Sequence, residues 1–234
     1  MRIYKDPNEM VREVERDLFE MGIRVQSGTM QDKDVHDNPD YETIEVQAYG
    51  YTLTDCNPML VREGVIKYLH GNPEWAETEF RDRINPDYIN PGCAWELYRE
   101  VWAEFLRDGQ FAYTYNERFR EQLPQVIREL NVRPNTRQAI MTMYDRHQDM
   151  ANWGGKDRIP CSLSYQFYIR GGQLHMIYTM RSCDFLTHFC HDVYFAAKLL
   201  HYVALHTRQP AGHLTHFMGS LHAYKKDMDK RGIF

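Results

Sequence analysis

The chain has 234 residues, 43% of them apolar, and a formal net charge of −5. This composition predicts a globular protein with one domain spanning residues 1–234, and the acidic balance excludes broad binding to nucleic acid polymers. Because no run of 18 apolar residues occurs and the first residues are polar, we expect a soluble, cytoplasmic protein with no membrane partner.

The first quarter of the chain alternates helix and strand patterns. Apolar residues at near-helical spacing predict a helix over 6–21 that packs on a sheet. The polar, turn-rich stretch 28–41 predicts a loop, and the alternation that follows predicts a strand over 41–53. A second helix is predicted over 58–69.

The middle of the chain is more charged. Residues 74–92 contain two Asn-Pro steps, which favour turns over a continuous helix, so we expect a surface insertion there. Apolar periodicity then predicts helices over 93–106 and 119–130, followed by a short strand over 139–144.

A hairpin is the clearest local signal. The alternating segments 161–169 and 174–181 flank an Arg-Gly-Gly-Gln turn. Such a hairpin brings Cys161, where one strand starts, close to Arg181, where its partner ends. After it, an apolar run over 193–206 predicts a buried central helix. Residues 213–224 predict a final strand.

The residues alone leave the function open. Cys161 could supply a thiolate nucleophile, and Arg181 could hold a phosphate or lower the thiol pKa, but a lone strand cysteine is more often an inert core residue. The cysteines are odd in number and lack paired spacing, which predicts free thiols at Cys56, Cys93, Cys161, Cys183 and Cys190. His188, Cys190 and His191 match no metal-binding pattern with a second ligand pair, so we predict no metal.

Several ordered motifs change this interpretation. They are RIPC at 158–161, YQFY at 165–168, MRSCD at 180–184 and GSLHAY at 219–224. In sequence and spacing the segment 158–224 resembles the thymidylate synthase superfamily. The resemblance implies an α+β (α/β two-layer) fold: a mixed, largely antiparallel sheet covered by helices, with one sheet face at a dimer interface. It also implies a homodimer and 5,10-methylenetetrahydrofolate as cosubstrate.

The resemblance assigns the nucleotide to one set of residues. Cys161 matches the nucleophile that adds to pyrimidine C6, so that C5 can attack the methylene carbon of the folate. Arg181 and Ser182 match phosphate ligands, and His222 with Tyr224 matches the pair that binds the sugar 3′-hydroxyl. A further phosphate ligand, Arg137, would come from the partner subunit.

Four other residues match positions for proton transfer and folate. Glu63 resembles the carboxylate that organises water for proton transfer, although an Arg-Glu step on a helix is more often solvated surface. Tyr115 resembles a second proton-transfer group. Trp102 and Asp184 resemble folate-site residues, with Asp184 bound to the pterin.

Asp192 indicates which base is bound. Thymidylate synthases carry Asn at the matching position, where the amide reads uracil N3-H and O4. Cytosine reverses both requirements, and a carboxyl group that accepts from N4 and shares a proton with N3 is complementary to it. Deoxycytidylate hydroxymethylases, the closest resemblance, carry Asp there. Asp192 could also cap the following helix, but Asn would cap equally well.

The sequence therefore predicts deoxycytidylate (dCMP) 5-hydroxymethylation, of the kind viruses use to modify DNA precursors. Ser162, where synthases usually have His, and the short stretch from Tyr224 to Phe234 favour water over hydride as the final reactant. The alternatives are a dCMP methyltransferase, a thymidylate synthase acting on deoxyuridylate (dUMP), and a non-catalytic family member that binds nucleotide or RNA.

Overall fold

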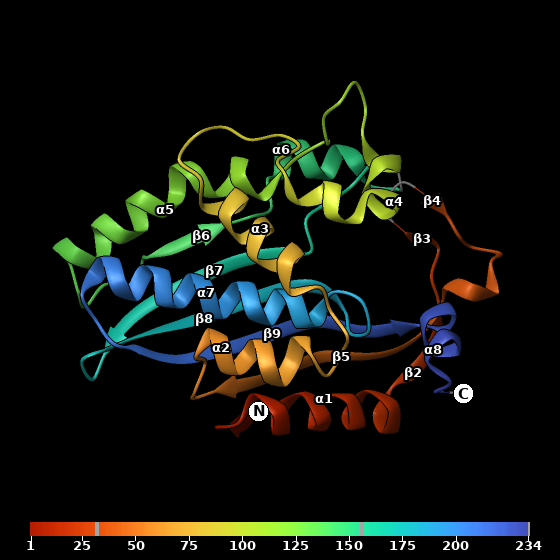
Figure 1. Cartoon of the computed structure of the whole chain (residues 1–234), viewed down its shortest axis with the longest axis horizontal. Coiled ribbons are helices and arrows are strands. Elements are labelled where there is room, and N and C mark those ends of the chain that lie inside the picture. The colour runs from red at the N-terminus through yellow and green to blue at the C-terminus, as the bar shows by residue number, and fades with distance from the viewer. Residues whose placement is uncertain (31–32, 155–156, 234) are drawn as a thin grey trace.

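A mixed sheet of seven strands forms the centre of the structure, a computed structural model that describes residues 1–30, 33–154 and 157–233 (Figure 1). Its order is β1-β5-β9-β8-β7-β6, with β2 paired to β5. The strands are β1 (Arg2–Tyr4), β2 (Ile23–Gln26), β5 (Glu42–Leu53), β6 (Ile140–Thr142), β7 (Ser162–Arg170), β8 (Gln173–Asp184) and β9 (Ala211–Tyr224). A separate pair is formed by β3 (Thr29–Met30) and β4 (Lys33–Asp34).

Two neighbouring pairs of strands run parallel, β8 with β9 and β1 with β5. The β8–β9 pair is parallel because the helix α7 (Phe189–Thr207) carries the chain back along the sheet between them. The other pairs are antiparallel. The predicted mixed α+β fold is confirmed, and the parallel β8–β9 contact brings the ends of these two strands together.

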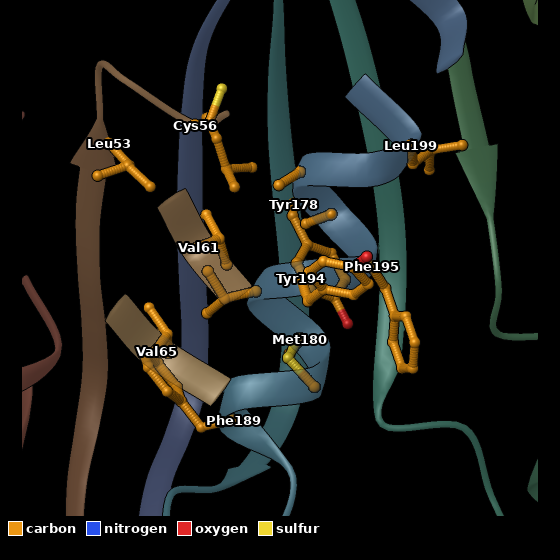
Figure 2. Close-up of a cluster of buried hydrophobic side chains, with 14 of the residues drawn as sticks. Leu53, Cys56, Val61, Val65, Tyr178, Met180, Phe189, Tyr194, Phe195 and Leu199 are labelled. Atoms are coloured by element: carbon orange, nitrogen blue, oxygen red, sulfur yellow. The ribbon is translucent and has the colours of Figure 1, made fainter. Parts of the chain in front are cut away.

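Helices α1, α2 and α7 lie over the sheet in Figure 1. The helices other than α7 are α1 (Pro7–Met21), α2 (Pro58–Val61), α3 (Pro73–Ile84), α4 (Arg99–Trp102), α5 (Tyr115–Val132), α6 (Arg146–Asp149) and α8 (Lys225–Arg231). In Figure 2, Phe189 of α7 lies near Met180 of β8 and Val65, which belongs to the π-helical turn η2 (Arg62–Ile66). All three are buried in the same core cluster, so α7 is held by apolar contacts along its length.

The hairpin between β7 and β8 forms as predicted. Gly171 and Gly172 have φ values of +59° and +72°. Positive φ at both central residues is what a two-residue type I′ turn requires, and glycine adopts it without steric cost. The pairing runs back to Ser162 and Met180, next to Cys161 and Arg181.

The predicted surface insertion over 74–92 is wrong in its first half, because α3 is a regular helix. Asn72 caps it by accepting from the backbone N–H groups of Glu74 and Trp75, at 2.9 and 3.0 Å. Trp75 and Phe80 are buried, so the helix belongs to the core. The sequence signal was an Asn cap followed by proline at the first helical position.

Two predicted helices are broken into shorter pieces. Segment 93–106 consists of the 3-10 turn η3 (Ala94–Tyr98), helix α4 and the 3-10 turn η4 (Ala103–Phe105), and segment 58–69 passes from α2 into η2. Of the helices in the described part of the chain, none combines the length and apolar character needed to cross a membrane. The expectation that water is the final reactant used the short stretch from Tyr224 to Phe234. Phe234 lies outside the described residues.

Replacing Gly22 with alanine tests how tightly α1 packs on β5. A Cβ atom there would overlap the side chain of Ile44 and the carbonyl oxygen of Leu18. Gly22→Ala should therefore lower the free energy of unfolding by about 1–3 kcal/mol, measured by urea denaturation. Gly28→Ala is the control because a Cβ atom at Gly28 meets open space. An equal effect of both variants would contradict this packing.

Candidate active site

A pocket of about 680 Å³ lies where β8 and β9 end. Its wall also includes residues of α3 and the first turns of α5 and α7. Nine of the predicted site residues line it: Cys161, Asp192, Tyr115, Arg181, Ser182, His222, Tyr224, Asp184 and Trp102. The two other predicted residues, Glu63 and Arg137, do not contribute to this wall. Predicted residues as far apart in the chain as Trp102 and Tyr224 thus meet around one cavity.

Cys161 and Arg181 are adjacent, as the hairpin predicts. The backbone N–H of Arg181 donates to the Cys161 carbonyl oxygen at 2.8 Å, and Arg181 Nη2 lies 3.8 Å from Cys161 Sγ. The guanidinium is held by the carbonyl oxygens of Pro160 and Ile159, at 2.9 and 3.0 Å. Burial raises the pKa of the Cys161 thiol above its ordinary value of 9.0, while Arg181 acts to lower it. The Cys161 side chain therefore rests as a thiol, and it would have to lose its proton to act as a nucleophile.

The residues expected to bind the sugar and the pterin stand at the ends of β8 and β9. Asp184 is the register partner of His222, and the His222 and Tyr224 rings meet edge to face at 5.2 Å. Burial lowers the pKa of His222, so its ring is neutral at pH 7 and can both donate and accept a hydrogen bond. The geometry places these groups together on one side of Cys161's pocket.

Asp192 does not start α7, in contrast to the prediction. The helix begins at Phe189, and His188 occupies the cap position without a capping side-chain hydrogen bond. Asp192 lies in the first turn and points to the pocket, where its Oδ2 accepts from Cys183 Sγ at 3.9 Å. Burial raises the pKa of its carboxyl group from 3.8 to about 7, although the Arg83 guanidinium acts to lower it. Near neutral pH this carboxyl group can therefore donate as well as accept a hydrogen bond.

Tyr115 begins α5 and reaches the peptide that follows the nucleophile. Its hydroxyl accepts from the backbone N–H of Ser162 at 3.4 Å. Burial holds the pKa of Tyr115 well above 10, so the phenol keeps its proton. Ser162 itself is buried and bonds to the Tyr178 hydroxyl at 2.6 Å, and it is not among the described residues of the pocket wall. Ser162 therefore lies behind the pocket wall, and its suggested effect on the reaction stays a prediction.

Among the described residues, the glutamate that lines the pocket is Glu79, not Glu63. The Glu63 side chain is 62% exposed and lies 3.9 Å from Lys67. Glu79, on α3, lines the pocket and accepts from Arg83 Nε at 2.8 Å. Glu79 went unrecognised because its helix was interpreted as an insertion.

Arg83 joins several parts of the site. Its guanidinium is buried between the rings of Tyr115 and Phe195, at 4.1 and 4.0 Å from their centroids. It also donates to Glu79 and acts on the Asp192 carboxyl group. Arg83 therefore connects α3 with α5 and α7 on one wall of the pocket.

Two further predictions concern Arg137, which lies outside the pocket wall, and His191, which lies on it. Arg137 is exposed, and its carbonyl oxygen accepts from Gln166 Nε2 at 3.1 Å. His191 accepts from the backbone N–H of Asn72 at 3.2 Å and packs against Trp75, so it fixes α3 to α7. Within the described residues, no group of three or more His, Cys, Asp or Glu side chains is arranged to hold a metal ion.

Comparisons with known proteins agree on one family. The family model described as Thymidylate synthase matches residues 62–232. A protein of Methanosarcina barkeri named "Putative thymidylate synthase" is 28% identical over 225 residues, which cover 91% of this chain and 94% of that protein. A protein of Methanosarcina acetivorans with the same name is 31% identical, covering 77% and 82%. The thymidylate synthase of Mycoplasma genitalium is 26% identical, covering 82% and 76%.

The raised pKa of Asp192 predicts a pH-dependent stability. Between about pH 4 and pH 7 the folded protein binds this proton and the unfolded chain does not, so folding loses stability as the pH rises. Asp192→Asn removes the titrating carboxyl group. The difference in free energy of unfolding, variant minus parent, should therefore increase by about 1–3 kcal/mol between pH 5 and pH 8. Asp37→Asn, at a fully exposed side chain, should show no such trend. A flat difference for Asp192→Asn in denaturant titrations would contradict the raised pKa.

Proposed function

The chain belongs to the thymidylate synthase family of one-carbon transferases, and we propose that it is a deoxycytidylate 5-hydroxymethyltransferase. The family uses methylenetetrahydrofolate as cosubstrate. The proposed reaction converts dCMP, 5,10-methylenetetrahydrofolate and water into 5-hydroxymethyl-dCMP and tetrahydrofolate. The observation that carries the choice of base is Asp192, a carboxyl group on the pocket wall with a pKa of about 7.

Asp192 fits cytosine better than uracil. With its proton, the carboxyl group donates to cytosine N3 through its hydroxyl and accepts from the N4 amino group through its carbonyl oxygen. Uracil presents N3-H and the acceptor O4 instead. An ionised carboxylate has no donor for O4, and the protonated group would have to place its hydroxyl at O4 and its carbonyl oxygen at N3-H, the reverse of its arrangement for cytosine. Cys183 Sγ, 3.9 Å from Oδ2, and the Arg83 guanidinium act to lower the pKa of this carboxyl group. Asp184 and Glu79 act to raise it.

The proposed steps use Cys161 as the nucleophile. Its thiol loses a proton and the sulfur adds to C6, so that C5 becomes nucleophilic and attacks the methylene carbon of the folate. Loss of the C5 proton and of tetrahydrofolate leaves an exocyclic methylene on the ring. Water adds to this carbon, the electron pair returns through the ring, and the C6–S bond breaks. This step releases 5-hydroxymethyl-dCMP and restores the Cys161 thiolate, so the atoms and charges of the reaction balance.

Glu79 is the proposed carboxylate for proton transfer and for the attacking water. Its Oε1 is held by Arg83 Nε at 2.8 Å, so the second oxygen can direct a water into the pocket. The Tyr115 ring stacks on the same guanidinium at 4.1 Å. This arrangement supplies a base and a phenol on the side of the pocket where water must react.

The phosphate and sugar are assigned to the groups around Cys161. Arg181 and Ser182 would bind the phosphate, and His222 with Tyr224 the 3′-hydroxyl. The proposal includes a homodimer in which Arg137 of the partner subunit adds a phosphate contact.

Product analysis tests the proposed function. The protein is incubated with 5,10-methylenetetrahydrofolate and either dCMP or dUMP, with Cys161→Ala as the inactive control. A mass gain of hydroxymethyl on dCMP without dihydrofolate absorbance is expected. Formation of methyl-dCMP together with dihydrofolate would make the protein a dCMP methyltransferase. Methylation of dUMP together with dihydrofolate would show the thymidylate synthase activity that the relatives' names favour. No product with either base would contradict catalysis of this kind.

Asp192→Asn tests the base selection. The amide can donate to O4 and accept from N3-H, so the ratio of kcat/KM for dUMP to that for dCMP should rise at least about 10-fold. Steady-state rates with both nucleotides measure this ratio. An unchanged ratio would remove Asp192 from base selection while leaving the reaction type open.

Glu79→Gln tests the reassigned carboxylate. Loss of a general base should lower kcat by about 10²–10⁴ with a small change in the KM for dCMP. Glu63→Gln is the matched control and should leave kcat unchanged, because that side chain is exposed and outside the pocket wall. The reverse pattern in single-turnover rates would restore Glu63 as the functional group.

A further inference from the structure

Arg158 is a buried cation without an acidic partner among the described residues. It is 8% exposed, and its Nε has no hydrogen-bond partner. Its guanidinium lies 4.6 Å from the centroid of the Trp102 ring, and the rings of Phe111 and Tyr113 follow at 5.3 and 5.1 Å. Phe105 closes the group at 5.6 Å. These aromatic faces attract the cation but offer it no hydrogen-bond acceptor.

Other buried arginines of the chain show what Arg158 lacks. Arg83, also held between aromatic rings, donates to Glu79 at 2.8 Å. Arg118, whose side chain is 10% exposed, pairs with Asp149 at 3.1 Å. Burying a guanidinium without such a partner is costly, since its N–H donors lose water and gain nothing in return. The aromatic contacts recover only part of this free energy.

The unpaired guanidinium faces the pocket. Arg158 lines the cavity together with Trp102 and Cys161. Arg181, the other arginine near the thiol, is already bound to the Pro160 and Ile159 carbonyl oxygens. Trp102 also lies 6.3 Å from the ring of His188, so Arg158 belongs to an aromatic part of the pocket wall. A flat ligand with an acidic group fits these walls.

We propose that Arg158 forms an oxyanion-binding subsite on the aromatic side of the pocket and takes a carboxylate of the one-carbon donor. This inference rests on the proposed function, because the donor is the ligand with both a flat ring system and carboxylates. The guanidinium binds a carboxylate through two parallel N–H donors, which is the arrangement that its planar fork favours. The nucleotide phosphate is the other source of an oxyanion, and the experiment separates the two.

Three variants test the subsite. Arg158→Met keeps the apolar contacts with the rings and removes the charge, Arg158→Lys keeps the charge without the fork, and Arg128→Met removes an exposed arginine of α5 as a control. Dissociation constants are measured by calorimetry for tetrahydrofolate, for 6-methyltetrahydropterin, which lacks the carboxylates, and for dCMP. Melting temperatures are measured without ligand.

Arg158→Met should weaken tetrahydrofolate binding at least about 10-fold and leave 6-methyltetrahydropterin and dCMP unaffected. Arg158→Lys should recover part of the loss, and Arg128→Met should show none. Without ligand, Arg158→Met should melt at the same temperature as the parent or higher, because an unpaired buried charge has been removed.

Two results would overturn the assignment. A lower melting temperature with unchanged tetrahydrofolate affinity would make Arg158 a structural cation. A loss of dCMP affinity alone would give the subsite to the phosphate and contradict the donor. If the parent bound no tetrahydrofolate, the proposed function would fail, and melting temperatures with inorganic phosphate would then test the subsite. A rise for the parent that is absent in Arg158→Met would support an oxyanion subsite at Arg158. An equal rise for both proteins would refute it.

Discussion

The register of the β7–β8 hairpin is the constraint on which the site depends. A two-residue turn at Gly171 and Gly172 fixes which residues face each other from Arg170 and Gln173 back to Ser164 and Thr179, and the pairing then shifts at an irregularity between Ser162 and Ser164. It ends with the Arg181 N–H bound to the Cys161 carbonyl oxygen at 2.8 Å. A slip of one residue would turn Arg181 to the other sheet face and leave the thiol without a neighbouring cation. The parallel β8–β9 pairing then adds His222 opposite Asp184.

Local patterns explain which parts of the structure could be predicted from the sequence. The hairpin depends on residues that are close in the chain, and the apolar run of α7 indicates a helix by itself. Glu79 could not be found in this way, since its position in the pocket depends on contacts of α3 with α5 and α7, more than 30 residues away. The Asn72 cap was the available local signal. Asp192 was correctly placed at the pocket, but its position in the first turn of α7 depends on where that helix starts.

Burial sets the protonation states of the pocket more than charge pairing does. The thiol pKa of Cys161 is raised although Arg181 Nη2 lies 3.8 Å from Sγ, and the carboxyl pKa of Asp192 is raised although Arg83 acts to lower it. Both groups therefore rest in their neutral forms at slightly acid pH. A ligand that supplies charges and hydrogen bonds can change these states on binding. Arg158 is a different case, because its buried guanidinium has no acidic partner among the described residues and a ligand would have to supply one.

In the proposed reaction, the proton of Asp192 would link recognition of the base to attack on it. A carboxyl group that donates to cytosine N3 withdraws electron density from the ring, and C6 then becomes a better acceptor for sulfur. The same proton is absent above the carboxyl pKa of about 7, while the thiolate of Cys161 becomes more available as the pH rises. The two requirements oppose each other, so the rate should pass through a maximum with pH. Base choice and nucleophilic addition would then depend on one shared proton, which explains why a carboxyl group with a pKa near 7 suits this position better than one with an ordinary pKa.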